Sequence, residues 1–226
     1  MNMYWILFIA IAVVSYAVQA NLKRKFNEYS KVTVSSGMTG AEVAKKMLQD
    51  HGIYNVTVKP HEGWLTDHYN PADKTVNLSK DVYYSNSVAA AAVAAHECGH
   101  AVQHATSYSF LQLRSSLVPI VTFSNNIVSW VILAGILMIN TFPGLMLFGI
   151  ILFAMTTLFS FVTLPVEIDA SMRATKWLSK AGITSNRDYP MAVGALRSAA
   201  YTYVVAALSS LATLIYYVMI YMSRRD

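Results

Sequence analysis

The chain has 226 residues, of which 55% are hydrophobic and 13% are charged. This composition is too apolar for an ordinary soluble domain, and polar segments interrupt it too often for a pure membrane bundle. The formal net charge of +5 comes without the aromatic and basic pattern of nucleic-acid-binding proteins, so we expect no nucleic acid among the partners. The single cysteine, Cys98, excludes an intrachain disulfide.

Three apolar tracts account for the hydrophobicity and predict a mainly α-helical membrane protein. A membrane-spanning helix needs about 20 apolar residues, so the first and last tracts each fit one helix and the middle tract fits two. The sequence N-T-F-P-G at residues 140–144 is typical of the turn between two such helices. We therefore expect about four transmembrane helices, within residues 1–22, 115–166 and 198–226.

The distribution of basic residues predicts how the chain is oriented in the membrane. With four spans, the segments 23–114 and 167–197 lie on one side and carry every lysine and arginine except Arg224 and Arg225. The positive-inside rule makes this side cytoplasmic and places both termini outside. We therefore expect a multi-pass protein of the plasma membrane whose polar segments 23–114 and 167–197 face the cytoplasm.

The first apolar tract has a second interpretation. Residues 18–20 read Val-Gln-Ala, which resembles the cleavage site of a signal peptide. No lysine or arginine precedes the apolar run, however, whereas Lys23, Arg24 and Lys25 follow it at once. This asymmetry favours an uncleaved N-terminal transmembrane anchor over residues 1–22.

The polar segment 23–114 has the features of a small α+β domain. Thr39 and Glu42 form a capping-box pattern that predicts a helix through about Gln49. Short strands are expected over residues 55–59, 65–69 and 75–78, with a turn at 70–73. Together with the helix described next, this is the layout of a zincin-like domain. One strand would be the edge on which an extended peptide pairs, and the sequence leaves open which one.

The residues Ser85, Asn86 and Ser87 are expected to cap an Ala-rich helix that is predicted from Val88 to Ala105 and carries the motif H-E-x-x-H. Residues four apart share one face of a helix, so His96 and His100 can hold one metal ion between them. Glu97 projects beside them, where its carboxylate can take a proton from a metal-bound water. The motif therefore predicts two ligands of a Zn²⁺ ion and a catalytic base.

The third metal ligand is expected after the membrane hairpin, in residues 167–197. Glu167 is the first charged residue after the tract 115–166, on the same side of the membrane as the motif. Two histidines and a glutamate are a common ligand set of catalytic zinc. His104 continues the four-residue rhythm and is the rival third ligand. Asp169 and Ser171 are both candidates for orienting a ligating histidine.

A peptidase also needs a donor that stabilises the oxyanion formed at the attacked carbonyl. The candidates are His68, Tyr69, Arg173, Arg197 and Tyr201. Among them, His68 and Tyr69, in the sequence T-D-H-Y-N-P, are the preferred catalytic residues.

These motifs together resemble the membrane gluzincins, the group that includes HtpX and the CAAX prenyl proteases. In that group the later segment reads E-x-x-A-D and its glutamate binds zinc. Here Glu167 and Ala170 match, whereas Ser171 stands where the aspartate would be. The combination of A-A-H-E-C-G-H-A-V-Q, L-T-D-H-Y-N-P and L-P-V-E-I-D-A-S is similar, over nearly the whole chain, to the YugP-like zinc metallopeptidases of bacterial membranes. The resemblance implies a zinc-dependent, membrane-embedded peptidase.

The predicted function is that of a membrane-embedded zinc metalloendopeptidase that hydrolyses membrane-associated or unfolded proteins through a zinc-bound water. Its partners would be a peptide or protein substrate and the lipid bilayer. One rival is a site-2-type protease, which needs the motif inside a membrane span and a later Asp-Gly ligand. The other rival is a non-catalytic, zinc-stabilised membrane scaffold or chaperone, which would have no need of Glu97 as a base.

Overall fold

A computed structural model describes residues 3–63 and 66–223 of the chain. The helices are α1 (Met3–Tyr29), α2 (Gly40–Asp50), α3 (Lys80–Tyr83), α4 (Val88–Ala105), α5 (Ser109–Leu137), α6 (Pro143–Lys180) and α7 (Tyr189–Ser223). The strands are β1 (Thr57–His61), β2 (His68–Asn70) and β3 (Thr75–Ser79). The mainly helical architecture with a small sheet agrees with the predicted fold class.

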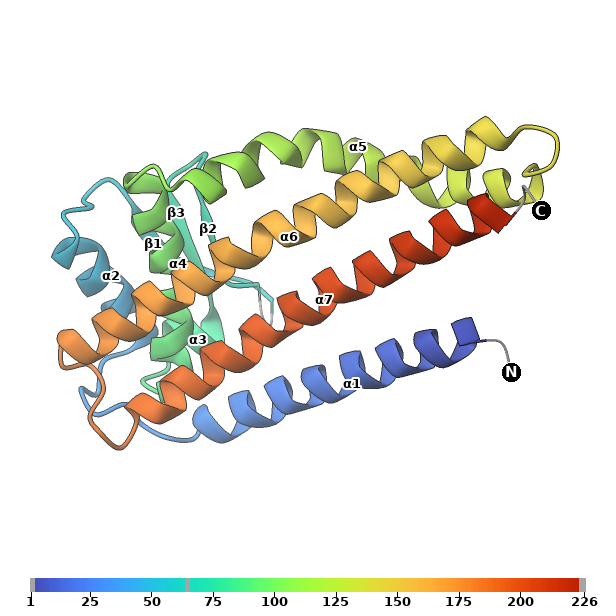
Figure 1. Ribbon diagram of the computed structural model, residues 1–226. Helices are drawn as coiled ribbons and strands as arrows, with labels where there is room; N and C mark the ends of the chain where they lie inside the picture. The colour runs from blue at the N-terminus through green and yellow to red at the C-terminus, as the bar shows by residue number, and fades with distance from the viewer. Residues whose placement is uncertain (1–2, 64–65, 224–226) are drawn as a thin grey trace.

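The four longest helices lie side by side in the order α5, α6, α7, α1, and the small domain sits at one end of this row (Figure 1). Three of them, α5, α6 and α7, are long and apolar enough to cross a membrane. The N-terminal tract is not among these three. Its residues 1 and 2 lie outside the described part of the chain, and the rest of the tract forms the first part of α1.

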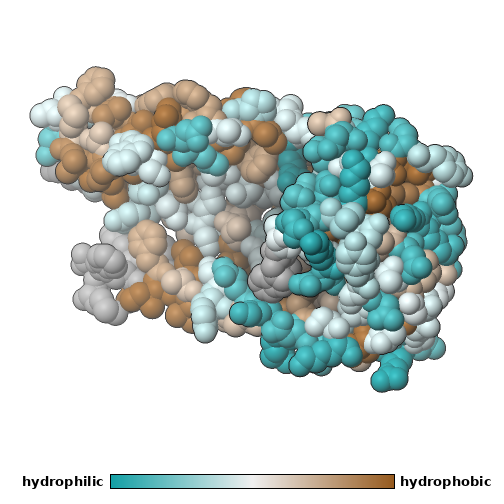
Figure 2. Space-filling view, turned by 180° about the vertical axis from the view of Figure 1, so that it is seen from behind, coloured by the Kyte–Doolittle hydropathy of each residue, from teal (hydrophilic) through white to brown (hydrophobic). Residues whose placement is uncertain are grey.

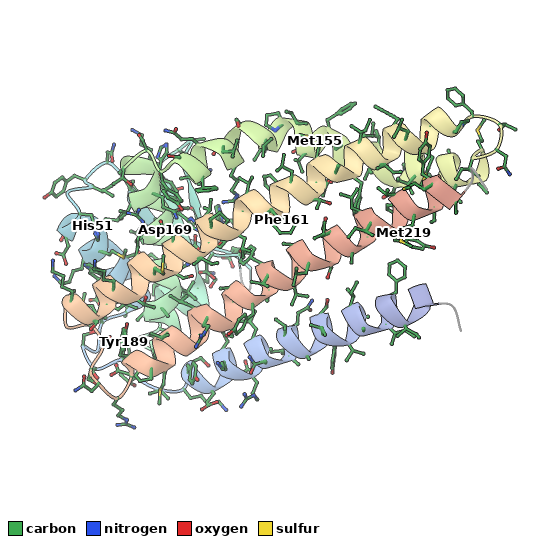
Figure 3. The ribbon with its side chains drawn as sticks, in the orientation of Figure 1. His51, Met155, Phe161, Asp169, Tyr189 and Met219 are labelled. Carbon is green, nitrogen blue, oxygen red and sulfur yellow. The ribbon has the colours of Figure 1, made fainter. Side chains whose placement is uncertain are left out.

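The apolar helices extend beyond the predicted spans into the polar end of the molecule. Helix α6 is the clearest case, because it runs without a break from Pro143 through Pro165 to Lys180. Figure 3 shows Asp169 near the domain end of α6 and Met155 farther along its apolar part. One continuous helix therefore connects the turn of the hairpin with the small domain.

The sheet has the strand order β1-β3-β2, with β1 parallel and β2 antiparallel to β3. The predicted second strand, residues 65–69, begins only at His68, and its residue 65 lies outside the described residues. A side chain explains the later start, because the Asp67 carboxylate accepts the Ser79 backbone N–H at 2.7 Å in place of a backbone ladder partner. The sequence left open which strand lies at the edge of the sheet. Both β1 and β2 are edge strands, and β2 is the one that packs next to α4.

The core of the small domain forms where α2 and the sheet pack on α4. The capping box predicted at Thr39 and Glu42 is present at the start of α2. The alanines of α4 from Ala89 to Ala101 are buried, as is Cys98, whose Sγ lies 3.5 Å from the Ala44 carbonyl oxygen. Burial raises the pKa of the Cys98 thiol, which identifies it as a packing residue rather than a nucleophile.

The Asp188 carboxylate links the start of α7 to the segment that follows α1 through hydrogen bonds. Asp188 is only 2% exposed and accepts hydrogen bonds from the backbone N–H groups of Ser35 and Ser185, both at 2.8 Å, and from both serine hydroxyls. Burial alone would raise the pKa of Asp188, but the hydrogen bonds from Ser185 and Ser35 outweigh it and hold the pKa at about 2.

We therefore expect Asp188→Asn to lower the free energy of unfolding by about 1–3 kcal/mol at neutral pH, as for a buried acceptor lost from a hydrogen-bonded group. Because the folded-state pKa lies below the unfolded value of about 4, the stabilisation is complete above pH 4 and is lost as the pH falls toward 2. Thermal unfolding in detergent between pH 2 and 7 measures this, with exposed Asp81→Asn as the control. An Asp188→Asn protein with the parent's melting temperature and pH profile would contradict it.

Candidate metal centre

Two helices supply the residues of the centre, and they approach each other very closely. The helix α4 begins at the N-cap Ser87, as expected, and presents His96 and His100 one turn apart, with ring centroids separated by 4.8 Å. A Cβ atom added to Gly99 would lie 2.7 Å from the carbonyl oxygen of Ala170 on α6. The absence of a side chain at position 99 therefore allows α6 to bring its own residues beside the histidines.

The residue that α6 brings is Glu167. Its Oε2 lies 3.3 Å from Nε2 of His96 and 3.6 Å from Nε2 of His100. The side chains of His96, His100 and Glu167 form a group whose ligand atoms all lie within 4.8 Å of one another. Ligands on a tetrahedral zinc ion, at about 2.0–2.1 Å from it, are themselves about 3.4 Å apart.

The burial of Glu167 tests whether this group fits a metal ion. The residue is 3% exposed, and its Oε2 atom is buried without a hydrogen-bond partner. A buried carboxylate oxygen left unpaired is costly unless a cation compensates it. The oxygen points at two imidazole nitrogens that can act as neutral ligands, so the donor set fits a zinc ion.

Each histidine is held through its other ring nitrogen. The Ser171 hydroxyl lies 3.1 Å from Nδ1 of His96, and the Gln103 Oε1 atom lies 3.0 Å from Nδ1 of His100. These contacts leave both Nε2 atoms directed at Glu167. Of the two candidates for orienting a ligating histidine, Ser171 therefore contacts one directly, whereas Asp169 reaches the other only through Gln103.

The link from Asp169 to the centre runs through Gln103, which sequence reasoning did not identify. Gln103 is fully buried and donates from Nε2 to Oδ2 of Asp169 and to the carbonyl oxygen of Val166, both at 2.8 Å. Arg173 also donates to Asp169, at 2.6 Å, and is not directed at the histidines. The amide of Gln103 is thus fixed at both ends, which fixes the orientation of His100.

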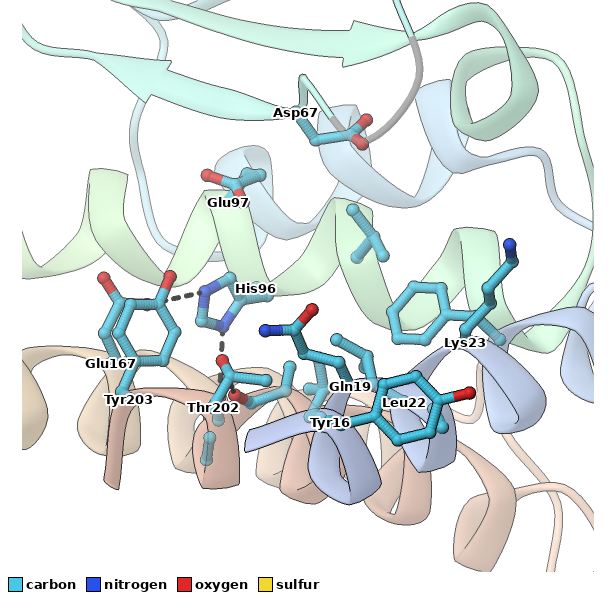
Figure 4. A pocket seen from close by; sticks show the side chains of 17 residues that line it. Tyr16, Gln19, Leu22, Lys23, Asp67, His96, Glu97, Glu167, Thr202 and Tyr203 are labelled. Atoms are coloured by element: carbon cyan, nitrogen blue, oxygen red, sulfur yellow. Dashed lines mark hydrogen bonds and ion pairs between the residues drawn. The ribbon is translucent and has the colours of Figure 1, made fainter. Parts of the chain in front are cut away.

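Glu97 lies beside the centre and faces the sheet (Figure 4). Its Oε2 accepts the backbone N–H of Tyr69 at 3.0 Å, and the residue is 8% exposed. The N–H of Tyr69 therefore points away from β3 and toward the motif helix. The edge of β2 that does not pair with β3 thus borders the centre.

The structure also locates the other candidate residues. The His68 ring contacts the Thr66 carbonyl oxygen at 2.7 Å, and the Tyr69 hydroxyl contacts Nδ1 of His104 at 2.9 Å. His104 is exposed and is not part of the group that His96, His100 and Glu167 form. Tyr201 is exposed and is not among the residues that line the cavities beside the histidines.

Two residues near the centre were not singled out from the sequence. Arg114 places Nη1 3.8 Å from Oε1 of Glu167, and Tyr203 of α7 lies beside Glu167 (Figure 4). A signal for Arg114 exists, because Arg114 and Glu167 are the charged residues that bracket the tract 115–166 and a hairpin brings its two ends together. Tyr203 has no such signal, since it lies in an apolar helix whose facing side depends on packing.

Two cavities meet at the centre. The α1-side cavity, of about 600 Å³, lies between α1, α4 and α7, and the α5-side cavity, of about 630 Å³, lies between β2, α4 and α5. Both are lined by the same five residues: Asp67, His96, Glu97, Glu167 and Tyr203. The candidate ligands His96 and Glu167, together with Glu97, therefore lie at the junction of the two cavities.

Among the described helices, α5, α6 and α7 meet the length and composition of a membrane span, and the motif helix α4, of 18 residues, is not one of them. The structure thus gives no support to a site-2-type arrangement, in which the motif would lie inside a span.

Comparison with known proteins supports a zinc site at this centre. Residues 4–222 match the family described as "Putative neutral zinc metallopeptidase". The chain is 43% identical over 222 residues to a protein of Bacillus subtilis (strain 168) named "Putative membrane protease YugP", covering 97% of this chain and 98% of that one. No solved structure matches the chain.

The family match covers almost the whole chain and includes both the H-E-x-x-H helix and Glu167. The family is described as a zinc metallopeptidase, which favours a hydrolase of peptide bonds over a non-catalytic scaffold. The chain belongs to the neutral zinc metallopeptidase family.

Proposed function

We propose that the protein is a membrane-embedded zinc metalloendopeptidase in which His96, His100 and Glu167 hold the catalytic Zn²⁺. The observation that carries this proposal is the buried Oε2 of Glu167, which has no hydrogen-bond partner and faces both histidine Nε2 atoms. Three protein ligands leave one position open, as in catalytic rather than structural zinc sites.

Glu97 is the general base of the proposed reaction. Zinc, when bound, lowers the pKa of water and polarises the carbonyl of the peptide bond. Glu97 faces the place where the two cavities meet, and the Tyr69 N–H fixes its carboxylate. It takes the proton of the attacking water and passes it to the leaving amine.

His68 and Tyr69 are the proposed donors to the oxyanion. Both line the α5-side cavity beside Glu97. Strand β2 pairs with β3 through its other edge, and at the edge that faces the centre the Tyr69 N–H donates to Glu97. An extended peptide can add to this edge by donating a backbone N–H to the Tyr69 carbonyl oxygen, which points the same way as the Tyr69 N–H, and this makes an unfolded segment the proposed form of the substrate.

The site lies where the apolar helices meet the polar domain. Hydrophilic side chains gather on the domain and hydrophobic ones along the helices in Figure 2. We infer that α1 is a fourth span beside α5, α6 and α7, and that the protein is a multi-pass protein of the plasma membrane. The basic residues next to the site then face the cytoplasm, where membrane-associated or unfolded proteins would be cleaved.

The role of Glu97 predicts the effect of Glu97→Gln. Cleavage of an unfolded protein by the purified, detergent-solubilised protein should fall at least about 100-fold, because general acid–base catalysis contributes about 10²–10⁴-fold. Zinc content should not change, since Glu97 is not a proposed ligand. Glu28→Gln, an exposed glutamate of α1, is the matched control. Undiminished cleavage by Glu97→Gln would refute the assignment.

The histidine contacts predict a separate loss of zinc affinity. Gln103→Leu and Ser171→Ala each remove the partner of one Nδ1 atom, so each should weaken zinc binding about 10–100-fold. Competition with a chromophoric chelator measures the affinity, and Gln112→Leu, on the exposed face of α5, serves as the control for the glutamine change. Affinities equal to the parent's for both variants would show that these contacts do not orient the ligands.

A further inference from the structure

The α1-side cavity is bounded by regular stripes from two helices. On α7 the lining residues follow helical spacing at Leu196, Ala199, Ala200 and Tyr203, and on α1 they do so at Tyr16, Gln19, Lys23 and Phe26. Leu22 on α1 and Val93 on α4 add further apolar surface. The cavity is therefore mainly apolar, and side chains of α1, α4 and α7 form most of its walls.

The charged and metal-binding candidates of the α1-side cavity lie at its two ends. Figure 4 shows Lys23 at the end away from His96, and His96, Glu97 and Glu167 at the other end. Side chains of α1, among them Gln19 and Leu22, lie between these two ends. The volume of the α1-side cavity, about 600 Å³, lies within the range of about 300–1,000 Å³ that holds a drug-sized ligand. The cavity therefore has enough room for a large side chain.

The direction of β2 tells which end of a substrate would reach this cavity. Asp67 lines both cavities, whereas His68, Tyr69 and Pro71, which follow it, line only the α5-side cavity. The strand therefore runs from the α1 side to the α5 side. A peptide added antiparallel to β2, the more stable pairing, runs the opposite way and enters the α1-side cavity with its C-terminal part.

We propose that the α1-side cavity is the specificity pocket for a large apolar side chain on the C-terminal side of the cleaved bond. This rests on the proposed function. The scissile carbonyl lies at Glu97 and the zinc ligands, and the residue that follows it places its side chain between α1 and α7. Desolvation of that side chain supplies the preference.

Helix α1 is then part of the site as well as an anchor. It packs mainly on α7, where Nζ of Lys25 donates to the Gly194 carbonyl oxygen at 3.3 Å. The Tyr29 hydroxyl lies 3.3 Å from where a Cβ of Gly194 would be, so the two helices are held close at this end. This packing fixes the wall of the pocket opposite Ala199 and Ala200.

Filling the pocket tests the proposal. Cleavage sites in a proteome-derived peptide library are read by mass spectrometry for the parent protein, for Ala200→Phe and for the control Ala206→Phe, an exposed position of α7 outside both cavities. The parent and Ala206→Phe should cleave before large apolar residues such as Leu or Phe. Ala200→Phe should cleave such sites at least about 10-fold more slowly, yet keep its zinc content and its cleavage before Ala or Gly.

A second variant changes the pocket in the opposite direction. Leu22→Ala enlarges it from the α1 wall and should raise relative cleavage before Trp, which keeps the proposal testable if Ala200→Phe does not fold. Unchanged profiles for the folded variants, or changes confined to the residue before the cleaved bond, would overturn the proposal. A parent protein that holds zinc but cleaves nothing would instead overturn the proposed function, and this proposal with it.

Discussion

The close crossing of α4 and α6 is the constraint on which the rest of the structure depends. Gly99 leaves room for the backbone of Ala170, and Glu167, nearly one turn earlier on α6, is thereby buried against the two histidines. A larger residue at position 99 would push α6 away and separate the carboxylate from the imidazoles. Because a buried, unpaired carboxylate oxygen is unfavourable, the crossing and a bound cation stabilise each other.

The membrane helices take part in building the site. The hairpin of α5 and α6 returns Arg114 to the side of Glu167, and α6 carries its ligand as part of one rod that starts at Pro143. The rows of side chains on α1 and α7 line one of the two cavities that meet at Glu97. A protein organised in this way has its proposed catalytic groups at the boundary between an apolar and a polar environment, where a membrane-associated chain is within reach.

The sequence predicted what local patterns specify. The H-E-x-x-H helix, its Ser87 cap, the capping box of α2 and the partnership of Glu167 with His96 and His100 follow from spacing and from the membrane hairpin. It did not predict Gln103 or Tyr203, because their neighbours come from helices whose facing sides depend on packing. The start of β2 at His68 was also unpredictable, since it depends on the contact between Asp67 and Ser79. Nor does a sequence pattern show that two cavities meet at the centre.

Zinc X-ray absorption spectroscopy of the purified protein, beside Glu167→Gln and His104→Gln, identifies the third zinc ligand. We expect two imidazole ligands and carboxylate oxygen at the zinc of the parent. His104→Gln should give the same spectrum, and Glu167→Gln should lose stoichiometric zinc. A three-imidazole spectrum that changes in His104→Gln and survives in Glu167→Gln would show that Glu167 is not the third ligand.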